Sequence, residues 1–339
     1  MIAASRFVRT LSRAVAIMLC ASASGCVGRS QAAQLPLKLV ADIPIGAATR
    51  RFDYESLDPK TGLLFMADLA GGRVLVVDVK ANRLVKVIPN VSGVHGVLAV
   101  PEQRRVYASA TGADEVVTID ERTLTVIGRG PSGHYPDGIA WEPTRNKLYV
   151  SDESGKVVGV IDAATNKLLS QIPMGGEVGN TQYDRADGLI YSNEQTTNEL
   201  VAIDPAADKI AGRWPLPGCT ENHGLLIDPQ RQLAYVACQG NAKLLVISLK
   251  DHKVVSKQPI GAGPDVLAAD FALSRLYVAG EAGVVSVFDI SSPTLRKLGE
   301  EKLADNAHIV GVDPTSHRVY FPLRNLGGQA VLRVMDAIP

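Results

Sequence analysis

The sequence predicts an all-β protein, a seven-bladed β-propeller with four antiparallel strands in each blade, and three observations support this prediction. An aromatic anchor within a strand-like run recurs seven times, every 42 to 44 residues. Each unit repeats the same order of short apolar runs separated by Gly, Pro, Asn and Asp, which is typical of antiparallel sheet. The last unit stops after its third run, whereas an unpaired run precedes the first unit.

The anchor strands are the clearest element of each unit, and their segments read LLFMAD, RVYASA, KLYVSD, LIYSNE, LAYVAC, RLYVAG and RVYFPL. Their aromatic residues are Phe65, Tyr107, Tyr149, Tyr191, Tyr235, Tyr277 and Tyr320. Before each anchor strand comes a short apolar run that ends in a turn, as in GIAWEPTRN (138–146). A third strand such as VVTID (116–120) and a fourth such as RLVKVIP (83–89) follow. Four strands in about 42 residues is the size of one propeller blade.

The two ends of the chain are predicted to complete one blade together. The seventh unit ends soon after VLRVMDA without a fourth strand, and LPLKLVADIPIG (35–46) lies alone before the first unit. We expect residues 37–44 to supply the outer strand of the last blade, because this pairing removes an open sheet edge. All seven units then belong to one domain, residues 37–339.

The anchors LYVSD and VYASA, the VxVID strands and the Asp-Pro turns resemble the YVTN-type β-propeller repeat family. The resemblance covers residues 37–339 and implies the propeller fold. It also implies an exported bacterial or archaeal protein, since many members of that family are exported. It implies no reaction, because a fold alone does not give chemistry.

The N-terminus has the pattern of an export leader over residues 1–26, followed by a linker over 27–36. Three arginines precede an apolar stretch, AVAIMLCASASG (14–25), that is too short to span a membrane. Two processing patterns compete, because Ala21-Ser22-Ala23 fits the small-x-small cleavage rule and Ala23-Ser24-Gly25-Cys26 resembles a lipobox without its usual Leu. We therefore expect an exported protein, either periplasmic or anchored to the cell envelope by a lipid on Cys26.

The composition excludes some classes of partner. The 35 basic and 35 acidic residues balance, so no basic surplus supports binding to nucleic acid. No segment after the leader is apolar enough to span a bilayer, so the membrane is a partner only through a lipid anchor. We expect a monomer whose partner is a small molecule or an envelope protein.

A polar ring is predicted around the axis of the propeller. The innermost strand of each blade lines the central channel, and the residue twelve positions before each anchor lies where that strand begins. Six of the seven residues at this position can carry a charge or bind a metal. In blade order they are Asp53, His95, Asp137, Gly179, His223, Asp265 and His308.

Three of the six histidines of the chain, His95, His223 and His308, thus approach one axis from blades two, five and seven. Imidazoles arranged in this way suit a divalent transition metal, so we expect a divalent metal ion as cofactor. The three aspartates of the ring would orient the imidazoles, or one of them would act as a general base beside a metal-bound water. The alternative is that the Asp and His residues only shape the turns that open the strands, because both residue types bond nearby backbone amides.

The loops after the anchor strands should open on the same face. Their charged or amide residues include Asp68, Asp152, Glu153, Glu194, Gln195 and Glu281, and such loop residues are usually just solvated. Blade four has Gly179 in the ring, so a gap beside Asn180, Gln182 and Glu194 would admit a ligand. Glu194 is also a candidate catalytic residue, together with Asp53, Asp137 and Asp265.

Two cysteines remain after the leader, Cys219 and Cys238, and both belong to blade five. A disulfide between them would close a loop of about 20 residues in an oxidising compartment. The alternative is a soft-metal site in which Cys219, His223 and Cys238 select copper or zinc.

The sequence leaves two main functions open. The first is binding of a divalent metal and a small oxygen-rich ligand at the axial ring, with hydrolase or lyase activity on a lactone, ester or sugar acid. The second is a non-catalytic scaffold that binds another envelope protein. Electron transfer is a weaker third alternative, because the sequence has no C-x-x-C-H haem attachment motif.

Overall fold

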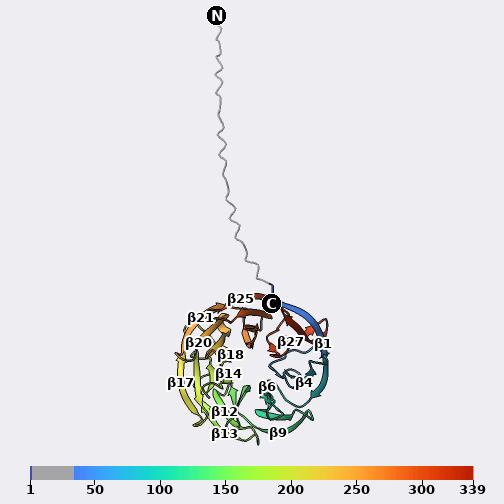
Figure 1. Ribbon diagram of the computed structural model, residues 1–339, viewed down its shortest axis with the longest axis vertical. Coiled ribbons are helices and arrows are strands. Elements are labelled where there is room, and N and C mark those ends of the chain that lie inside the picture. Colours follow the sequence, from blue (N-terminus) through green and yellow to red (C-terminus); the bar gives the residue numbers. More distant parts are fainter. Residues whose placement is uncertain (2–33, 339) are drawn as a thin grey trace. The chain divides into compact units, whose positions relative to one another are not determined.

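Each of the seven predicted units forms a four-stranded antiparallel sheet in the computed structural model, and the sheets stand side by side around a central axis (Figure 1). The structure describes Met1 and residues 34–338. The predicted leader, the lipidation site Cys26 and most of the linker lie outside the described residues. The seven-bladed all-β fold is confirmed.

Six blades are continuous in sequence, and each runs from the innermost strand to the outermost. The strands of blades one, two and three are β2 (Glu55–Asp58), β3 (Leu63–Asp68), β4 (Arg73–Asp78), β5 (Arg83–Ile88); β6 (Val94–Val100), β7 (Arg105–Ala110), β8 (Glu115–Asp120), β9 (Thr125–Pro131); β10 (Pro136–Glu142), β11 (Lys147–Asp152), β12 (Val157–Asp162) and β13 (Leu168–Pro173). The strands of blades four, five and six are β14 (Val178–Tyr183), β15 (Ile190–Glu194), β16 (Glu199–Asp204), β17 (Lys209–Pro215); β18 (Asn222–Asp228), β19 (Leu233–Cys238), β20 (Lys243–Ser248), β21 (Lys253–Pro259); β22 (Pro264–Asp270), β23 (Arg275–Gly280), β24 (Val284–Asp289) and β25 (Arg296–Lys302). Two single-turn 3₁₀ helices, η1 (Thr111–Ala113) and η2 (Gln239–Asn241), follow β7 and β19.

The seventh blade joins both ends of the domain. It contains β26 (Gly311–Val312), β27 (Arg318–Leu326), β28 (Gln329–Ala337) and, as its outer strand, β1 (Leu37–Ala47). The predicted closing strand is confirmed and extends to Ala47. Arg333 on β28 donates two hydrogen bonds to the Asp42 carboxylate on β1, both at 2.8 Å.

The core lies between neighbouring blades. The second and third strands of each blade are buried on both faces, because a blade stands between two others. Their sequences are accordingly almost continuous apolar runs. The aromatic anchors pack here with almost no exposed surface, and the Tyr149 hydroxyl still finds a partner, because it donates to Asp208 at 2.5 Å. The outer strands alternate between exposed and partly buried residues, as in β9 and β21.

Candidate functional site

A β-bulge near the start of the inner strand aims the ring residues at the axis. In β6 the pairing with β7 shifts between Val94 and Val97, so His95 and Gly96 leave the regular ladder. The same shift occurs at Asp137 in β10, at Gly179 in β14, at His223 in β18 and at Asp265 in β22. Bulges redirect a side chain, and this one recurs in five blades at the position that the repeat spacing identified.

Each bulge packs against the next blade, and this packing fixes the ring. A Cβ added at Gly96 would lie 2.3 Å from the carbonyl oxygen of Asp137, and one at Gly224 would lie 2.1 Å from that of Asp265. Glycine is therefore required after these two histidines because the neighbouring backbone approaches so closely. The Ser109 hydroxyl donates a hydrogen bond to the Asp137 carbonyl at 2.6 Å and accepts one from the Gly96 amide at 2.7 Å. These turns therefore also hold neighbouring blades together.

Five of the seven ring residues line one cavity of about 360 Å³, which we name the upper cavity. Its lining residues are Arg51, Asp53, Leu69, His95, Tyr135, Asp137, Glu153, His223, Gln239, Asp265 and Glu281. They include five carboxyl groups, two histidines and one arginine, so acidic groups outnumber basic groups in the upper cavity. Repeat spacing identified the ring aspartates and histidines, but it missed Arg51, which lies in the irregular segment before β2.

His223 and Asp265 form an ion pair in this cavity, with 3.3 Å between His223 Nε2 and Asp265 Oδ1. Burial lowers the pKa of His223, but Asp265 and then Asp137 outweigh this effect and raise it to about 10. Burial likewise raises the pKa of Asp265, and His223 more than reverses this, so that the pKa is lowered. His223 is therefore an imidazolium and Asp265 a carboxylate at neutral pH.

Asp53 and Asp137 differ from Asp265, because their pKa values are raised and not lowered. Each is only 3% exposed, and burial followed by repulsion from another ring aspartate raises the pKa of both. Oδ1 of Asp137 has no hydrogen-bond partner among the described residues. The cavity thus contains two buried carboxyl groups whose pKa values are raised.

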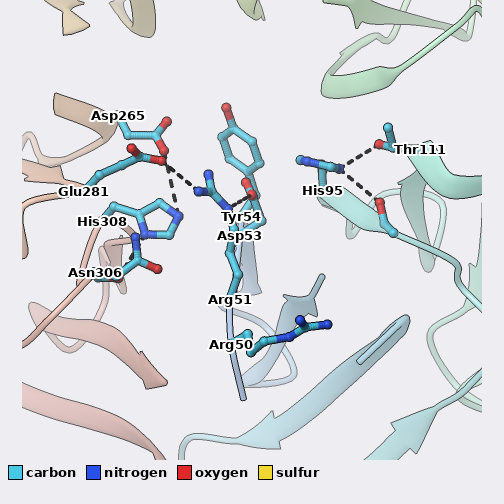
Figure 2. A network of polar contacts seen from close by, with 12 residues as sticks. Arg50, Arg51, Asp53, Tyr54, His95, Thr111, Asp265, Glu281, Asn306 and His308 are labelled. Atoms are coloured by element: carbon cyan, nitrogen blue, oxygen red, sulfur yellow. Dashed lines mark hydrogen bonds and ion pairs between the residues drawn. The ribbon is translucent and has the colours of Figure 1, made fainter. Parts of the chain in front are cut away.

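His95 presents its Nε2 lone pair. Its Nδ1 lies 3.0 Å from the Gly93 carbonyl oxygen and 2.7 Å from Thr111 Oγ1 (Figure 2). Because a carbonyl can only accept, Nδ1 carries the proton in this contact. The Tyr135 hydroxyl lies 3.4 Å from Nε2.

His308 lies behind the cavity wall and is fully buried. Its Nδ1 donates to the Asn306 carbonyl at 2.9 Å, and its Nε2 lies 3.8 Å from Asp265 Oδ2 (Figure 2). Blade seven differs because β26 has only two residues, so His308 precedes the strand instead of forming its first bulge. Within residues 34–338, no three His, Cys, Asp or Glu side chains are arranged to hold a metal ion. The predicted set of His95, His223 and His308 does not converge on one point.

The three residues predicted to border a ligand gap in blade four do not line the upper cavity. Asn180 and Gln182 line a second cavity of about 540 Å³ at the other end of the channel, which we name the lower cavity. Glu194 lines neither cavity, and its carboxylate instead accepts the amides of Thr196 and Thr197 at 3.2 and 2.9 Å. Glu194 therefore shapes its own loop. It is also buried, whereas charged residues in these loops were expected to be solvated. Tyr54, which also lines the lower cavity, donates a hydrogen bond to Asn180.

Cys219 and Cys238 form a disulfide in the structure, with their Cα atoms 5.3 Å apart. Both sulfur atoms are thereby committed, which leaves no thiolate for the alternative soft-metal site with His223. The bridge links the loop that enters blade five to the upper end of β19, close to the bulge that carries His223.

Comparisons with known proteins agree with the fold. A model of the YNCE-like beta-propeller family matches residues 52–188. A chain of hydrazine synthase from Kuenenia stuttgartiensis has a similar structure, with a TM-score of 0.72 and 15% sequence identity over 92% of this chain and 99% of that chain. At this identity the likeness shows the fold alone. No curated protein matches the sequence.

The seven blades, the repeat and the family match agree with one another. No helix among the described residues has both the length and the apolar character to cross a bilayer. The chain folds as a seven-bladed β-propeller, and its residues 52–188 are similar to the YNCE-like beta-propeller family.

Proposed function

We propose that this propeller is an exported protein that binds a divalent cation in the upper cavity and, through it, a small oxygen-rich ligand. One observation carries the proposal: Asp53, Asp137 and Asp265 are each 3% exposed and line the same cavity. Burying carboxyl groups together is costly unless a cation compensates them. A divalent cation would add positive charge beside Asp53 and Asp137 and would lower their raised pKa values.

The donor set differs from the one that the histidine pattern predicted. Carboxylate oxygens from the three aspartates, with Nε2 of His95, favour manganese, calcium or zinc over the soft metals. Because no three of these groups are in position together among the described residues, binding requires small rotations of the aspartate side chains. His308 would contribute only by holding Asp265 in place.

The chemistry open to such a site is hydrolysis or elimination. A cation held by few protein ligands keeps positions for the oxygens of a ligand and can polarise a carbonyl group. Asp137, with its unpartnered oxygen, is the candidate general base, and protonated His223 is the candidate acid. Lactones, esters and uronate sugars are the substrate classes to screen.

Export is part of the proposal because of the leader-like residues 1–26 and the disulfide, which suits an oxidising compartment. Processing either at Ala23 or before Cys26 gives a periplasmic or a lipid-anchored protein. Mass spectrometry of the mature N-terminus distinguishes the two, since a lipidated Cys26 adds the mass of the acyl chains.

A scaffold that binds an envelope protein is the second candidate, and the rim of the propeller favours it. Large aliphatic side chains are exposed on five of the seven outer strands, namely at Leu39, Val87, Ile127, Leu169 and Val255. This function requires no cation, and alanine at the rim would then weaken partner binding while alanine in the ring would not.

Metal content tests the main proposal. The chain from residue 27 onward is purified without an affinity metal, dialysed against calcium, manganese and zinc in turn, and analysed by elemental mass spectrometry. We expect about one ion per chain, lost in Asp137→Asn and retained in the control Asp305→Asn, whose side chain is 75% exposed. Absence of any bound ion after all three incubations would refute metal binding and favour the scaffold.

A further inference from the structure

The guanidinium of Arg51 is a positive charge that already lies at the mouth of the upper cavity. Its Nε donates to Asp53 Oδ2 at 3.2 Å and its Nη1 to Glu281 Oε1 at 2.7 Å, so the side chain reaches from blade one to blade six (Figure 2). Among the described residues these two carboxylates are the only hydrogen-bond partners of the guanidinium. The Arg51 side chain is still 36% exposed, which leaves it room to turn outward.

The guanidinium is matched to the charge of the cavity. Arg51 is the only arginine or lysine among the lining residues, against five carboxyl groups. Burial lowers the pKa of Arg51, but Asp53 and Glu281 outweigh burial and raise it, so the side chain stays charged. Arg51 is therefore an example of the kind of group that this cavity binds, namely an alkylguanidinium between two carboxylates.

Deeper in the cavity, His223 pairs with Asp265, and the Asp137 carboxyl group has an oxygen without a partner among residues 34–338. Asp137 is 3% exposed, and the oxygen without a partner is its Oδ1. A group with several N–H donors could satisfy this oxygen together with Asp53, whereas a neutral hydroxyl would leave the carboxylates without a counter-charge.

We propose that the upper cavity is a cation seat which Arg51 fills in the free protein, and that ligands bearing a guanidinium or primary ammonium group bind there by displacing Arg51. This goes beyond the proposed metal function, because it assigns an organic cation as a ligand class. It also makes Arg51 a tethered competitor of any metal ion that uses Asp53. Removal of the Arg51 side chain should therefore open the seat.

Calorimetric titration with methylguanidinium chloride at constant ionic strength tests the proposal. The variants are Arg51→Ala and Arg51→Gln, with Arg50→Ala as the matched control, because Arg50 is exposed and turns away from the cavity (Figure 2). Circular dichroism first verifies that each variant is folded, and the glutamine variant keeps most of the packing if the alanine variant is unstable.

We expect both Arg51 variants to bind one methylguanidinium per chain at least about tenfold more tightly than the wild type, which corresponds to about 1.4 kcal/mol. Arg50→Ala should behave as the wild type. Equal affinity in all four proteins, or no binding to either Arg51 variant, would overturn the cation seat.

Titration of the same proteins with Mn²⁺ separates the two proposals. We expect Mn²⁺ to bind Arg51→Ala at least about tenfold more tightly than the wild type. Equal Mn²⁺ affinity in both would overturn the competition and leave the metal site standing. Binding of methylguanidinium by the Arg51 variants with no Mn²⁺ bound by any protein would refute the metal proposal and support the cation seat.

Discussion

The hydroxyl of Tyr54 in blade one donates a hydrogen bond to the side-chain oxygen of Asn180 in blade four, on the far side of the channel. Tyr54 follows Asp53 and Asn180 follows Gly179, so this contact lies directly beneath the polar ring. Both residues line the lower cavity and neither lines the upper one. The contact therefore belongs to the lower cavity, although each of its residues directly follows a ring residue in the sequence.

Removing this contact should destabilise the propeller measurably. In Tyr54→Phe the Asn180 oxygen loses its donor, and we expect the free energy of unfolding to fall by about 1 to 2 kcal/mol. Urea denaturation of Tyr54→Phe, Asn180→Ala and the double variant gives the coupling between the two residues. Strictly additive effects would show that the hydrogen bond contributes nothing.

The His223–Asp265 pair should make stability depend on pH. The pKa of His223 is raised from 6.5 to about 10 in the folded protein, so the folded state binds more protons than the unfolded state between these values. The stability it contributes is present below pH 6.5 and is lost as pH rises toward 10, by about 1.4 kcal/mol for each unit of pKa difference. The raised pKa values of Asp53 and Asp137 act in the same direction as pH rises.

Urea titrations at pH 6, 8 and 10 measure this loss. We expect a smaller decline in His223→Gln, because the histidine part of the proton linkage is gone. An identical decline in the wild type and the variant would mean that His223 does not hold its proton in the folded state.

The disulfide should stabilise blade five. Closing a loop of this size typically contributes about 3 kcal/mol through the unfolded state. We expect the double variant Cys219→Ser, Cys238→Ser to lose stability of this order in urea. Addition of dithiothreitol should lower the stability of the wild type and leave the variant unchanged, and equal stability of all samples would contradict the bridge.

The closing strand offers a matched pair of substitutions. Ile43 is 3% exposed and Leu39 is 51% exposed, although both lie on β1. We expect Ile43→Ala to cost about 2 to 5 kcal/mol, because it leaves a cavity in the core, and Leu39→Ala to cost far less. Similar values from thermal or urea unfolding would mean that β1 does not pack into blade seven as described.

The repeat made the fold predictable, because it places every strand at a known distance from a buried aromatic anchor. The same spacing predicted that the residue twelve positions before Tyr107 or Tyr235 faces the axis, since the bulge recurs with the repeat. It failed for His308, where the inner strand shrinks to two residues and the histidine is drawn into the interior. Periodicity predicts the features that all blades share, and it does not predict a local exception in one blade.

Contacts between side chains of different blades could likewise not be predicted from the sequence. Arg51 precedes its strand and reaches Glu281, which is 230 residues away in the chain. Glu194 looked like a ligand-binding residue, yet it bonds the amides of its own loop. One clue to the crowded channel was present, because Gly follows both His95 and His223 at the point where the next blade comes too close for a side chain.

The blade built from both ends also sets an order of events in time. Asp42 and Arg333, which join β1 to β28, are 291 residues apart in the chain, so β1 leaves the ribosome long before its partner exists. Contacts of such high sequence separation slow folding, and an unpaired strand is prone to pair wrongly while it waits. The first six blades can form in order as they emerge, each packing against the blade before it. The ring itself stays open until the final strand arrives, and the nascent chain needs protection for that interval.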